Sequence, residues 1–345
     1  MNIKKESNVG ERKDFLDSIW NYTKSNPIVV MLAIVSIIIG CFVDNFFSWK
    51  NFNNLAINTS VRFIIALGVS GCLITNGTDL SAGRQVGLAA CLTAMLVQRA
   101  DYADKILSLE HDMNIWGVFL IIVALGIIMG LINGIIIAVA KVPPFIATLG
   151  TQTVIYGVSL IITNSQPIGG LQKAYTGAVN MLIFKGEAYP GLPVLMIVAG
   201  VLGLVFWFLY EKTLYGKYMY AIGGNEAAAE VSGVNTKKSK ILIYTVAGIM
   251  YATAGFLLAG KAGGASASLG QGYELEAIAG CTIGGVSTTG GIGKVSGVLV
   301  GVLVFELLKI VLQFLGVNPY YNYIVQGLVI IVAVALDIRK YIAKK

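Results

Sequence analysis

Charged side chains occur inside stretches of the sequence that are otherwise apolar. Arg62 lies in one such stretch, and Glu306 and Lys309 lie three residues apart in another. Because residues at i and i+3 share one face of a helix, Glu306 and Lys309 can form an ion pair. Such residues either line a polar path through a membrane or form a structural pair near a helix end, and both interpretations stay open. Glu274 and Glu276 are expected at the membrane interface, at the outer end of a short span.

A polar segment precedes the third apolar stretch. Asp79 and Ser81 can offer hydrogen bonds to the hydroxyl groups of a polar solute, and Gly83 and Arg84 follow directly. An ionisable residue so close to a span is costly, so we expect these four residues to belong to a translocation pathway or a gate. The alternative is local: Asp79 caps the helix that follows and pairs with Arg84.

A glycine-rich segment near the C-terminal third has the composition of a phosphate-binding loop but not its pattern. A Walker loop needs Gly-Lys followed by Ser or Thr, whereas Lys294 is followed by Val295. We interpret the segment as a tight turn and expect Gly284, Gly285 and Ser287 to contribute to the pathway or gate. No nucleotide-binding site is expected in this chain, so ATP and Mg²⁺, if they drive the protein, are bound by another chain.

The segment 211–240 is the longest loop expected between spans on the basic side of the protein. Asn225 is a favoured helix N-cap, Glu226 suits a helix N-terminus, and Gly233 suits the position after a helix end. The pattern predicts a short surface helix of about two turns that can dock into a groove of a soluble partner. A solvated loop is the alternative. The residues expected to make this contact are Asn225, Glu226, Ala227, Ala228, Ala229, Ser232 and Gly233.

No arrangement typical of an enzyme is present in the sequence. The only histidine, His111, stands in a polar loop, and GxSxG and HExxH patterns are absent. The four cysteines form no CxxC pair and are interpreted as small apolar residues. We expect neither a metal site nor a bound cofactor.

The composition places these residues in a membrane. Only 12% of the residues are charged and 56% are hydrophobic, and the mean hydropathy is +0.76. A soluble chain has about 25% charged residues, so a polytopic all-α membrane protein is predicted. About ten spans are expected, of which the third and eighth are short, glycine-interrupted and either broken or re-entrant. Their approximate ranges are 27–47, 57–75, 82–98, 115–140, 145–163, 191–210, 240–260, 274–288, 295–315 and 321–337.

The distribution of basic residues predicts an orientation. With a cytoplasmic N-terminus, the inside segments contain about three times as many Lys and Arg residues as the outside loops. Both termini are therefore expected in the cytoplasm, with the basic residues near anionic membrane lipid. The expected division is a cytoplasmic tail at 1–26, a transmembrane permease domain at 27–337 and a second tail at 338–345. The net charge of +7 is explained in this way, and no nucleic-acid partner is indicated.

Four stretches of the sequence carry a recognisable combination of motifs. They are Asp-Leu-Ser-x-Gly at 79–83, Pro-Phe-Ile-Ala-Thr-Leu-Gly at 144–150, Tyr-x-x-Ala-Ile-Gly-Gly-Asn at 218–225 and Tyr-Glu-Leu-Glu-Ala-Ile-Ala-Gly at 273–280. Together they resemble the permease subunits of bacterial ABC importers for monosaccharides, over about residues 55–340. Within this family, the run from Gly77 to Ala90, with Arg84-Gln85 after its core, is similar to the galactose and methyl-galactoside importers.

The resemblance implies a type II-like importer permease that works as a homodimeric pore. It implies two further partners, a cytoplasmic ABC ATPase and an extracytoplasmic sugar-binding protein, in a bacterial cytoplasmic membrane. Carried over onto this sequence, the ATPase-coupling segment of the family falls on Asn225 to Gly233. The implied cargo is galactose or methyl-galactoside, with glucose as a further candidate.

A different class of transporter remains an alternative. A secondary sugar transporter driven by a proton or sodium gradient would depend on intramembrane carboxylates, here Asp79 or Glu306. A membrane enzyme is disfavoured, because no catalytic constellation is present. Dependence of uptake on ATP or on the ion gradient would separate the two transporter classes.

Overall fold

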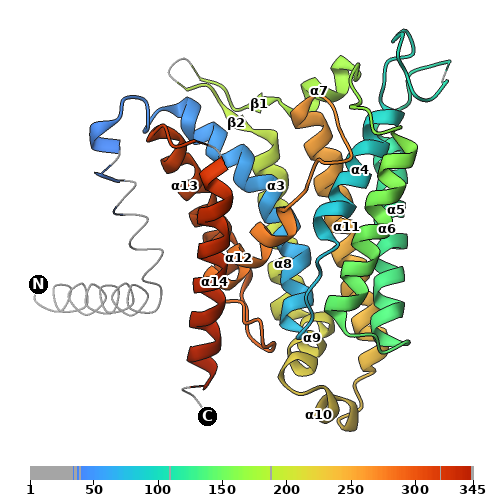
Figure 1. Cartoon of the computed structure of the whole chain (residues 1–345), viewed down its shortest axis with the longest axis vertical. Coiled ribbons are helices and arrows are strands. Elements are labelled where there is room, and N and C mark those ends of the chain that lie inside the picture. Colours follow the sequence, from blue (N-terminus) through green and yellow to red (C-terminus); the bar gives the residue numbers. More distant parts are fainter. Residues whose placement is uncertain are drawn as a thin grey trace, which may run out of the picture.

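The computed structural model is a bundle of helices whose long members run between two opposite ends of the molecule (Figure 1). It describes residues 34, 37, 38 and 40–342, apart from 109, 187, 188 and 319. The elements are α3 (Trp49–Ile74), α4 (Ala82–Leu96), α5 (Ile115–Ala138), α6 (Pro144–Ile162), α7 (Lys173–Val179), β1 (Leu182–Ile183), β2 (Leu192–Pro193), α8 (Val194–Lys212), α9 (Leu214–Gly224), α10 (Glu226–Val231), α11 (Thr236–Ala262), α12 (Tyr273–Ile283), α13 (Val295–Phe314) and α14 (Tyr320–Ile342).

Six of the described helices are long and apolar enough to cross a membrane. They are α3, α5, α6, α8, α11 and α13, and each coincides with a predicted span. Helix α14, with 23 residues, matches the predicted last span and continues to Ile342, into the segment expected to be a tail. The tail at 1–26 lies outside the described residues, and so does about half of the predicted span at 27–47.

The two segments expected to be broken are short helices. Helix α4 has 15 residues and α12 has 11, which at 1.5 Å per residue is less than the ~30 Å hydrocarbon core of a bilayer. Both are buried along most of their length, between the longer helices. Their backbone ends therefore meet protein rather than lipid, as irregular structure at membrane depth requires.

Helix α11 forms the centre of the fold together with α3, and both are mostly buried. Glycines allow α5 to lie directly against α11: a Cβ on Gly126, Gly130 or Gly134 would collide with the α11 backbone. Small residues have this role in membrane helices, because dispersion contacts replace the hydrophobic effect there. Helices α5, α6 and α8 turn large apolar side chains outward, as lipid-facing helices do.

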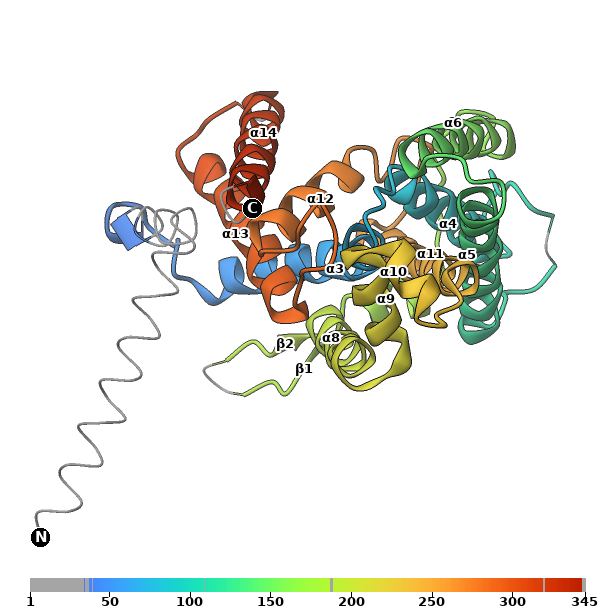
Figure 2. The ribbon, with the colours of Figure 1, turned by 90° about the horizontal axis from the view of Figure 1, so that it is seen from below.

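The connections gather at the two ends of the bundle. Helices α9 and α10 and the C-terminal end of α14 lie at one end, whereas α7 and the β1–β2 hairpin lie at the other (Figure 1). Viewed from the α10 end, α8 lies on the opposite side of α3 from α12 and α14 (Figure 2). The 11-residue helix α9 occupies part of the segment that the sequence had suggested to be a loop.

Candidate functional site

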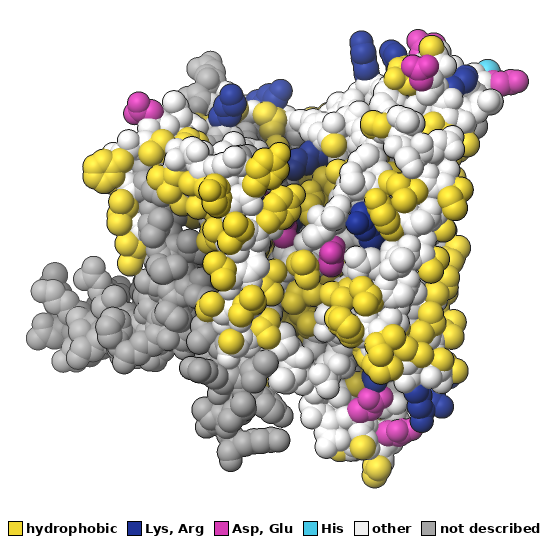
Figure 3. Space-filling view, in the orientation of Figure 1, with side chains coloured by type: hydrophobic (Ala, Val, Ile, Leu, Met, Phe, Trp, Pro, Cys, Tyr) yellow, Lys and Arg dark blue, Asp and Glu magenta, His cyan; other side chains and the backbone are white. Residues whose placement is uncertain are grey.

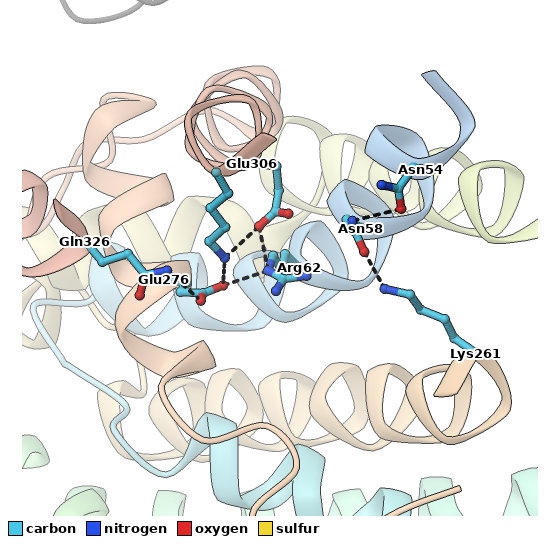
Figure 4. A network of polar contacts seen from close by, with 8 residues as sticks. Asn54, Asn58, Arg62, Lys261, Glu276, Glu306 and Gln326 are labelled. Atoms are coloured by element: carbon cyan, nitrogen blue, oxygen red, sulfur yellow. Dashed lines mark hydrogen bonds and ion pairs between the residues drawn. The ribbon is translucent and has the colours of Figure 1, made fainter. Parts of the chain in front are cut away.

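A cluster of four charged side chains joins the three helices α3, α12 and α13. Arg62 of α3 contacts both Glu276 of α12 and Glu306 of α13, with Nε–O distances of 2.6 Å in each case. Lys309 of α13 contacts the same two carboxylates, at 2.6 Å for Glu276 and 3.0 Å for Glu306. The pairing of Glu306 with Lys309 is thus confirmed, as part of a larger network (Figure 4).

The cluster is electrically balanced. Its two cations face two anions, and the side chains are between 3% and 15% exposed. Ions this far from water are tolerated only when each has a partner, because removal of one partner leaves an uncompensated charge. The cluster therefore ties α3, α12 and α13 together.

Polar and aromatic groups extend the cluster on two sides. Gln326 of α14 donates its Nε2 to Glu276 at 3.4 Å, and the Arg62 guanidinium lies 4.7 Å from the centre of the Tyr273 ring. On the face of the molecule that Figure 3 shows, a few charged side chains lie near the middle, with hydrophobic side chains on both sides of them. Glu274 and Glu276 lie in the first turn of the short helix α12, as expected, but the expected interfacial exposure was wrong: α12 is packed inside the bundle, which buries Glu274 and leaves the Glu276 side chain 11% exposed.

Asp79 lies in the buried loop between α3 and α4 rather than on an open surface. Its Oδ1 accepts hydrogen bonds from the Ser81 backbone N–H (3.0 Å) and from the Ser81 hydroxyl (2.5 Å). The Ser81 hydroxyl oxygen in turn accepts from Gln85 at 2.8 Å and from Asn133 of α5 at 2.9 Å. The network fixes the broken segment against α5, and both Asp79 and Ser81 are almost fully buried.

Arg84 does not pair with Asp79, so the pairing suggested as an alternative was wrong. Its guanidinium lies 4.0 Å from the centre of the Tyr156 ring of α6 and donates to the Ala267 carbonyl at 3.2 Å. A Cβ on Gly83 would collide with the Glu274 carboxylate, so glycine permits α4 to approach α12 here. Gly83 and Arg84 are therefore contact points between α4 and its neighbours.

The glycine-rich turn is confirmed and connects three parts of the chain. Gly285, Gly290 and Gly291 have positive φ angles of 86°, 89° and 75°, which side chains disfavour. The N–H of Gly291 donates to the Ile74 carbonyl at the end of α3 (2.8 Å). A Cβ on Gly223 of α9 would collide with both Gly291 and Ile74. The turn, α9 and the end of α3 therefore meet backbone against backbone.

Close backbone contacts also join α12 and α13, the two helices that the turn connects. A Cβ on Gly284 would collide with Gly297 at the start of α13, and a Cβ on Gly301 would collide with Gly280 of α12. The Ser287 N–H donates to the Ile292 carbonyl at 2.9 Å and closes the turn. Helices α12 and α13 are thus held at minimal separation on both sides of the turn.

The short surface helix predicted in the segment 211–240 is present as α10, with six residues. The Asn225 side chain accepts from the Ala228 N–H at 3.0 Å, which is the predicted N-cap, and Gly233 has a φ of +88° just after the helix end. Glu226 forms an ion pair with Lys240 of α11 at 2.6 Å. Ala227, Ala228 and Ser232 are exposed, whereas Ala229 is buried against the rest of the protein.

Two exposed residues of α10, Glu230 and Val231, lie within the expected coupling segment 225–233 but were not named individually as contact residues. Val231 is 91% exposed, although α10 lies beyond the apolar helices at an end of the bundle where a lipid-facing role does not apply. The sequence carried no clear signal for Val231, because the segment 211–240 contains several other apolar residues, among them Met219 and Ile222, which are buried. Together with the exposed Ala227 and Ala228, Val231 gives α10 a small, partly apolar outer surface.

The six long apolar helices, with the short helices α4 and α12 buried between them, define the class of this protein: a multi-pass membrane protein. Comparison with known sequences agrees with this class. The chain belongs to the family described as branched-chain amino acid transport system / permease component, whose profile matches residues 51–334. The chain is accordingly a transport subunit and not an enzyme.

The relatives with curated descriptions cover almost the whole chain. The galactose/methyl galactoside import permease protein MglC of Escherichia coli (strain K12) is 45% identical over 97% of this chain and 98% of that protein. Its namesake in Haemophilus influenzae is 43% identical over 93% of this chain and 96% of that protein. The ribose import permease protein RbsC of E. coli (strain K12) is 34% identical over 91% and 92%. No solved structure matches the chain.

Proposed function

We propose that this chain is the pore-forming permease of an ATP-driven importer for galactose and methyl galactoside, with glucose as a further substrate candidate. The observation that carries the proposal is the similarity to the MglC permeases, which extends over nearly the full length of both chains. The ribose permeases of H. influenzae and E. coli are 35% and 34% identical, less than the MglC permeases of E. coli and H. influenzae at 45% and 43%, which favours galactose and methyl galactoside over ribose.

Helix α10 is the proposed contact with a cytoplasmic ABC ATPase, which binds the ATP and Mg²⁺. Its exposed residues Ala227, Ala228 and Val231 offer a small, partly apolar surface, and a groove of about 480 Å³ lies beside it. This groove separates α10 from the connection between α5 and α6. Motion of α10 passes through α9 to the glycine turn, because Gly223 lies directly on Gly291.

The glycine turn and the Asp79 loop are the proposed moving parts of the pathway. Gly284, Gly285 and Ser287 lie in the turn, which contacts the end of α3 just before the loop that contains Asp79 and Ser81. A displacement of α9 therefore reaches both interrupted helices, α4 and α12. Gly83 and Arg84, at the start of α4, are the proposed points where that displacement changes the contact with α12 and α6.

We further propose a homodimer in the bacterial cytoplasmic membrane with both termini in the cytoplasm. Helices α10 and α14 end on the same side of the bundle, which agrees with the distribution of Lys and Arg. At the opposite end, Arg99, Lys173 and Lys261 surround a pocket of about 470 Å³. This basic pocket supports docking of an extracytoplasmic sugar-binding protein through acidic side chains.

The substitution Ala228→Asp tests the coupling assignment. Ala228 is exposed, so a carboxylate there leaves the fold intact but places charge in the contact with the ATPase. We expect the variant to lose co-purification with the ATPase and ATP-dependent uptake of labelled galactose in proteoliposomes. The matched control is Ala103→Asp, an exposed alanine in the connection between α4 and α5, which should retain both.

Two results would contradict the proposal. Normal ATPase binding and galactose uptake by the Ala228→Asp variant would remove α10 from the coupling contact. Uptake that survives ATP depletion but is abolished by a protonophore would show a gradient-driven transporter instead.

A further inference from the structure

An apolar groove runs along the side of the bundle where α3, α8 and α13 meet. It has a volume of about 600 Å³, and its lining is almost entirely apolar. Phe52 and Phe63 line it from α3, Met196 and Trp207 from α8, and Leu303 from α13. This side faces away from α12 and α14, so the groove is separate from the face that carries the charged cluster (Figure 2).

The length of the groove matches one fatty acyl chain. The α8 residues that line it run from Met196 to Trp207, which at 1.5 Å per residue corresponds to about 16 Å. Half of the ~30 Å hydrocarbon core of a bilayer has nearly the same depth. Gly200 and Gly203 leave space along this stretch, and a Cβ on Gly200 would meet no atom within 4 Å.

One end of the groove carries the marks of a membrane–water interface. The Trp207 ring is 44% exposed, and the Lys212 ammonium lies 5.7 Å from its centre. Trp side chains gather at the level of the lipid headgroups, and basic residues extend from there toward phosphate. The acyl chain of a lipid bound in this groove therefore enters at the Trp207 end, at the level of the lipid headgroups.

A basic pocket of about 650 Å³ lies one helical turn beyond Trp207, between the end of α8, helix α9 and the glycine turn that precedes α13. Lys217 and Lys294 line it, together with Glu211, Tyr210 and Tyr220. Neither lysine forms an ion pair within 4 Å in the part of the chain that the structure describes. The pocket adjoins the groove directly, because Lys294 precedes the groove residue Val295.

We propose that the groove and the basic pocket together form a binding site for one anionic phospholipid. Its acyl chain lies between α3, α8 and α13, and its phosphate is bound by Lys217 and Lys294. The two lysines exceed the single negative charge of Glu211, so the pocket favours phosphatidylglycerol over zwitterionic lipid. Assignment of this lipid to the cytoplasmic leaflet rests on the proposed orientation of α10; the site itself does not.

The acyl part of the site is tested by filling the groove. Gly200→Leu places a side chain in open space, and a helical glycine is replaced by a better helix former, so folding is retained. The control is Gly157→Leu on α6, where a Cβ also meets no atom within 4 Å but no groove is lined. Protein purified in mild detergent with phosphatidylglycerol is examined by native mass spectrometry, and bound lipid should fall severalfold in Gly200→Leu only.

The headgroup part is tested by neutralising the lysines. Each of Lys217→Gln and Lys294→Gln should lower phosphatidylglycerol affinity about fivefold, since a lysine at an anionic lipid contributes ~1 kcal/mol. Binding of phosphatidylethanolamine should change little. Lys238→Gln, an exposed lysine at the start of α11, is the control and should behave as the unaltered protein.

Two outcomes would overturn the proposal. One is equal retention of phosphatidylglycerol and phosphatidylethanolamine by all variants, which indicates an annular lipid only. The other is a disulfide between two chains at Gly200→Cys, made in a Cys41→Ser background, which shows that a second copy covers the groove. Neither result depends on sugar transport, so failure of this site and failure of the proposed function are distinguishable.

Discussion

At the scale of single residues, the arrangement of charge is the main feature of this protein. Arg62, Glu276, Glu306 and Lys309 are each bonded to two partners of opposite charge within the cluster. In a low-dielectric interior the complete set of four charges is tolerated, whereas the loss of one member leaves an unpaired charge that destabilises the fold. The same reasoning explains why the cluster can hold three separate helices in a fixed relation.

Removal of one charge should therefore be far more damaging than removal of an opposite pair. Glu306→Gln and Arg62→Met are each expected to lower the free energy of unfolding by about 3–5 kcal/mol. The double variant removes one cation and one anion and should lose much less than the sum. Thermal unfolding in detergent measures the effect, and additive losses would show that the two side chains act independently.

A surface ion pair supplies the control for this cycle. Arg99 and Asp101 lie 3.5 Å apart with side chains 40% and 77% exposed. Exposed pairs contribute about 0–1 kcal/mol, so Arg99→Met should leave the unfolding temperature nearly unchanged.

At the scale of elements, close backbone contacts between glycines determine which segments can move together. The contact of Gly223 with Gly291 and Ile74 links α9 to the glycine turn and to the end of α3. Such a junction transmits displacement because packed backbones have no side-chain freedom to absorb it. Helix α12 ends immediately before the glycine turn, and the loop that leads to α4 follows the end of α3.

Gly223→Ala should disrupt this junction, because the added methyl group would overlap the Ile74 carbonyl. Overpacking of this kind costs about 1–3 kcal/mol, and we expect galactose uptake to fall while α10 still binds the ATPase. Gly224→Ala is a matched control in the adjacent position, since a Cβ there meets no atom within 4 Å. Equal uptake by both variants would contradict a role of the junction in coupling.

At the scale of the whole molecule, the two ends of the bundle present different surfaces. One end carries the projecting helix α10 with its exposed Val231 and the lysine-lined pocket beside α9, and the other carries the pocket around Arg99, Lys173 and Lys261. Two different surfaces suit two different partners, as the proposed function requires.

Thiol labelling tests the orientation. In a Cys41→Ser background, Ala103→Cys should react with a membrane-impermeant maleimide in intact cells, because it lies at the end away from α10. Val231→Cys should react only after the membrane is opened, because the basic segments that flank α10 retain it in the cytoplasm. The reverse pattern of labelling would show that the chain is inserted the other way round.

Much of the molecule was predictable from local sequence. Apolar length and composition predicted six spans that coincide with described helices, because a bilayer requires about 20 apolar residues for each crossing. The cap at Asn225 and the stop at Gly233 predicted α10, since helix ends depend on side chains within a few residues.

Only the tertiary structure decided which charges meet. Glu276 was expected at an interface and lies in the buried cluster, whereas Asp79 and Arg84 were suggested as a pair and have separate partners. Arg62 and Glu276 are 214 residues apart in the chain, and no local pattern encodes a contact over that distance. The sequence by itself therefore determined the membrane class, most spans and the surface helix, while helix packing determined the charge network and the glycine junction.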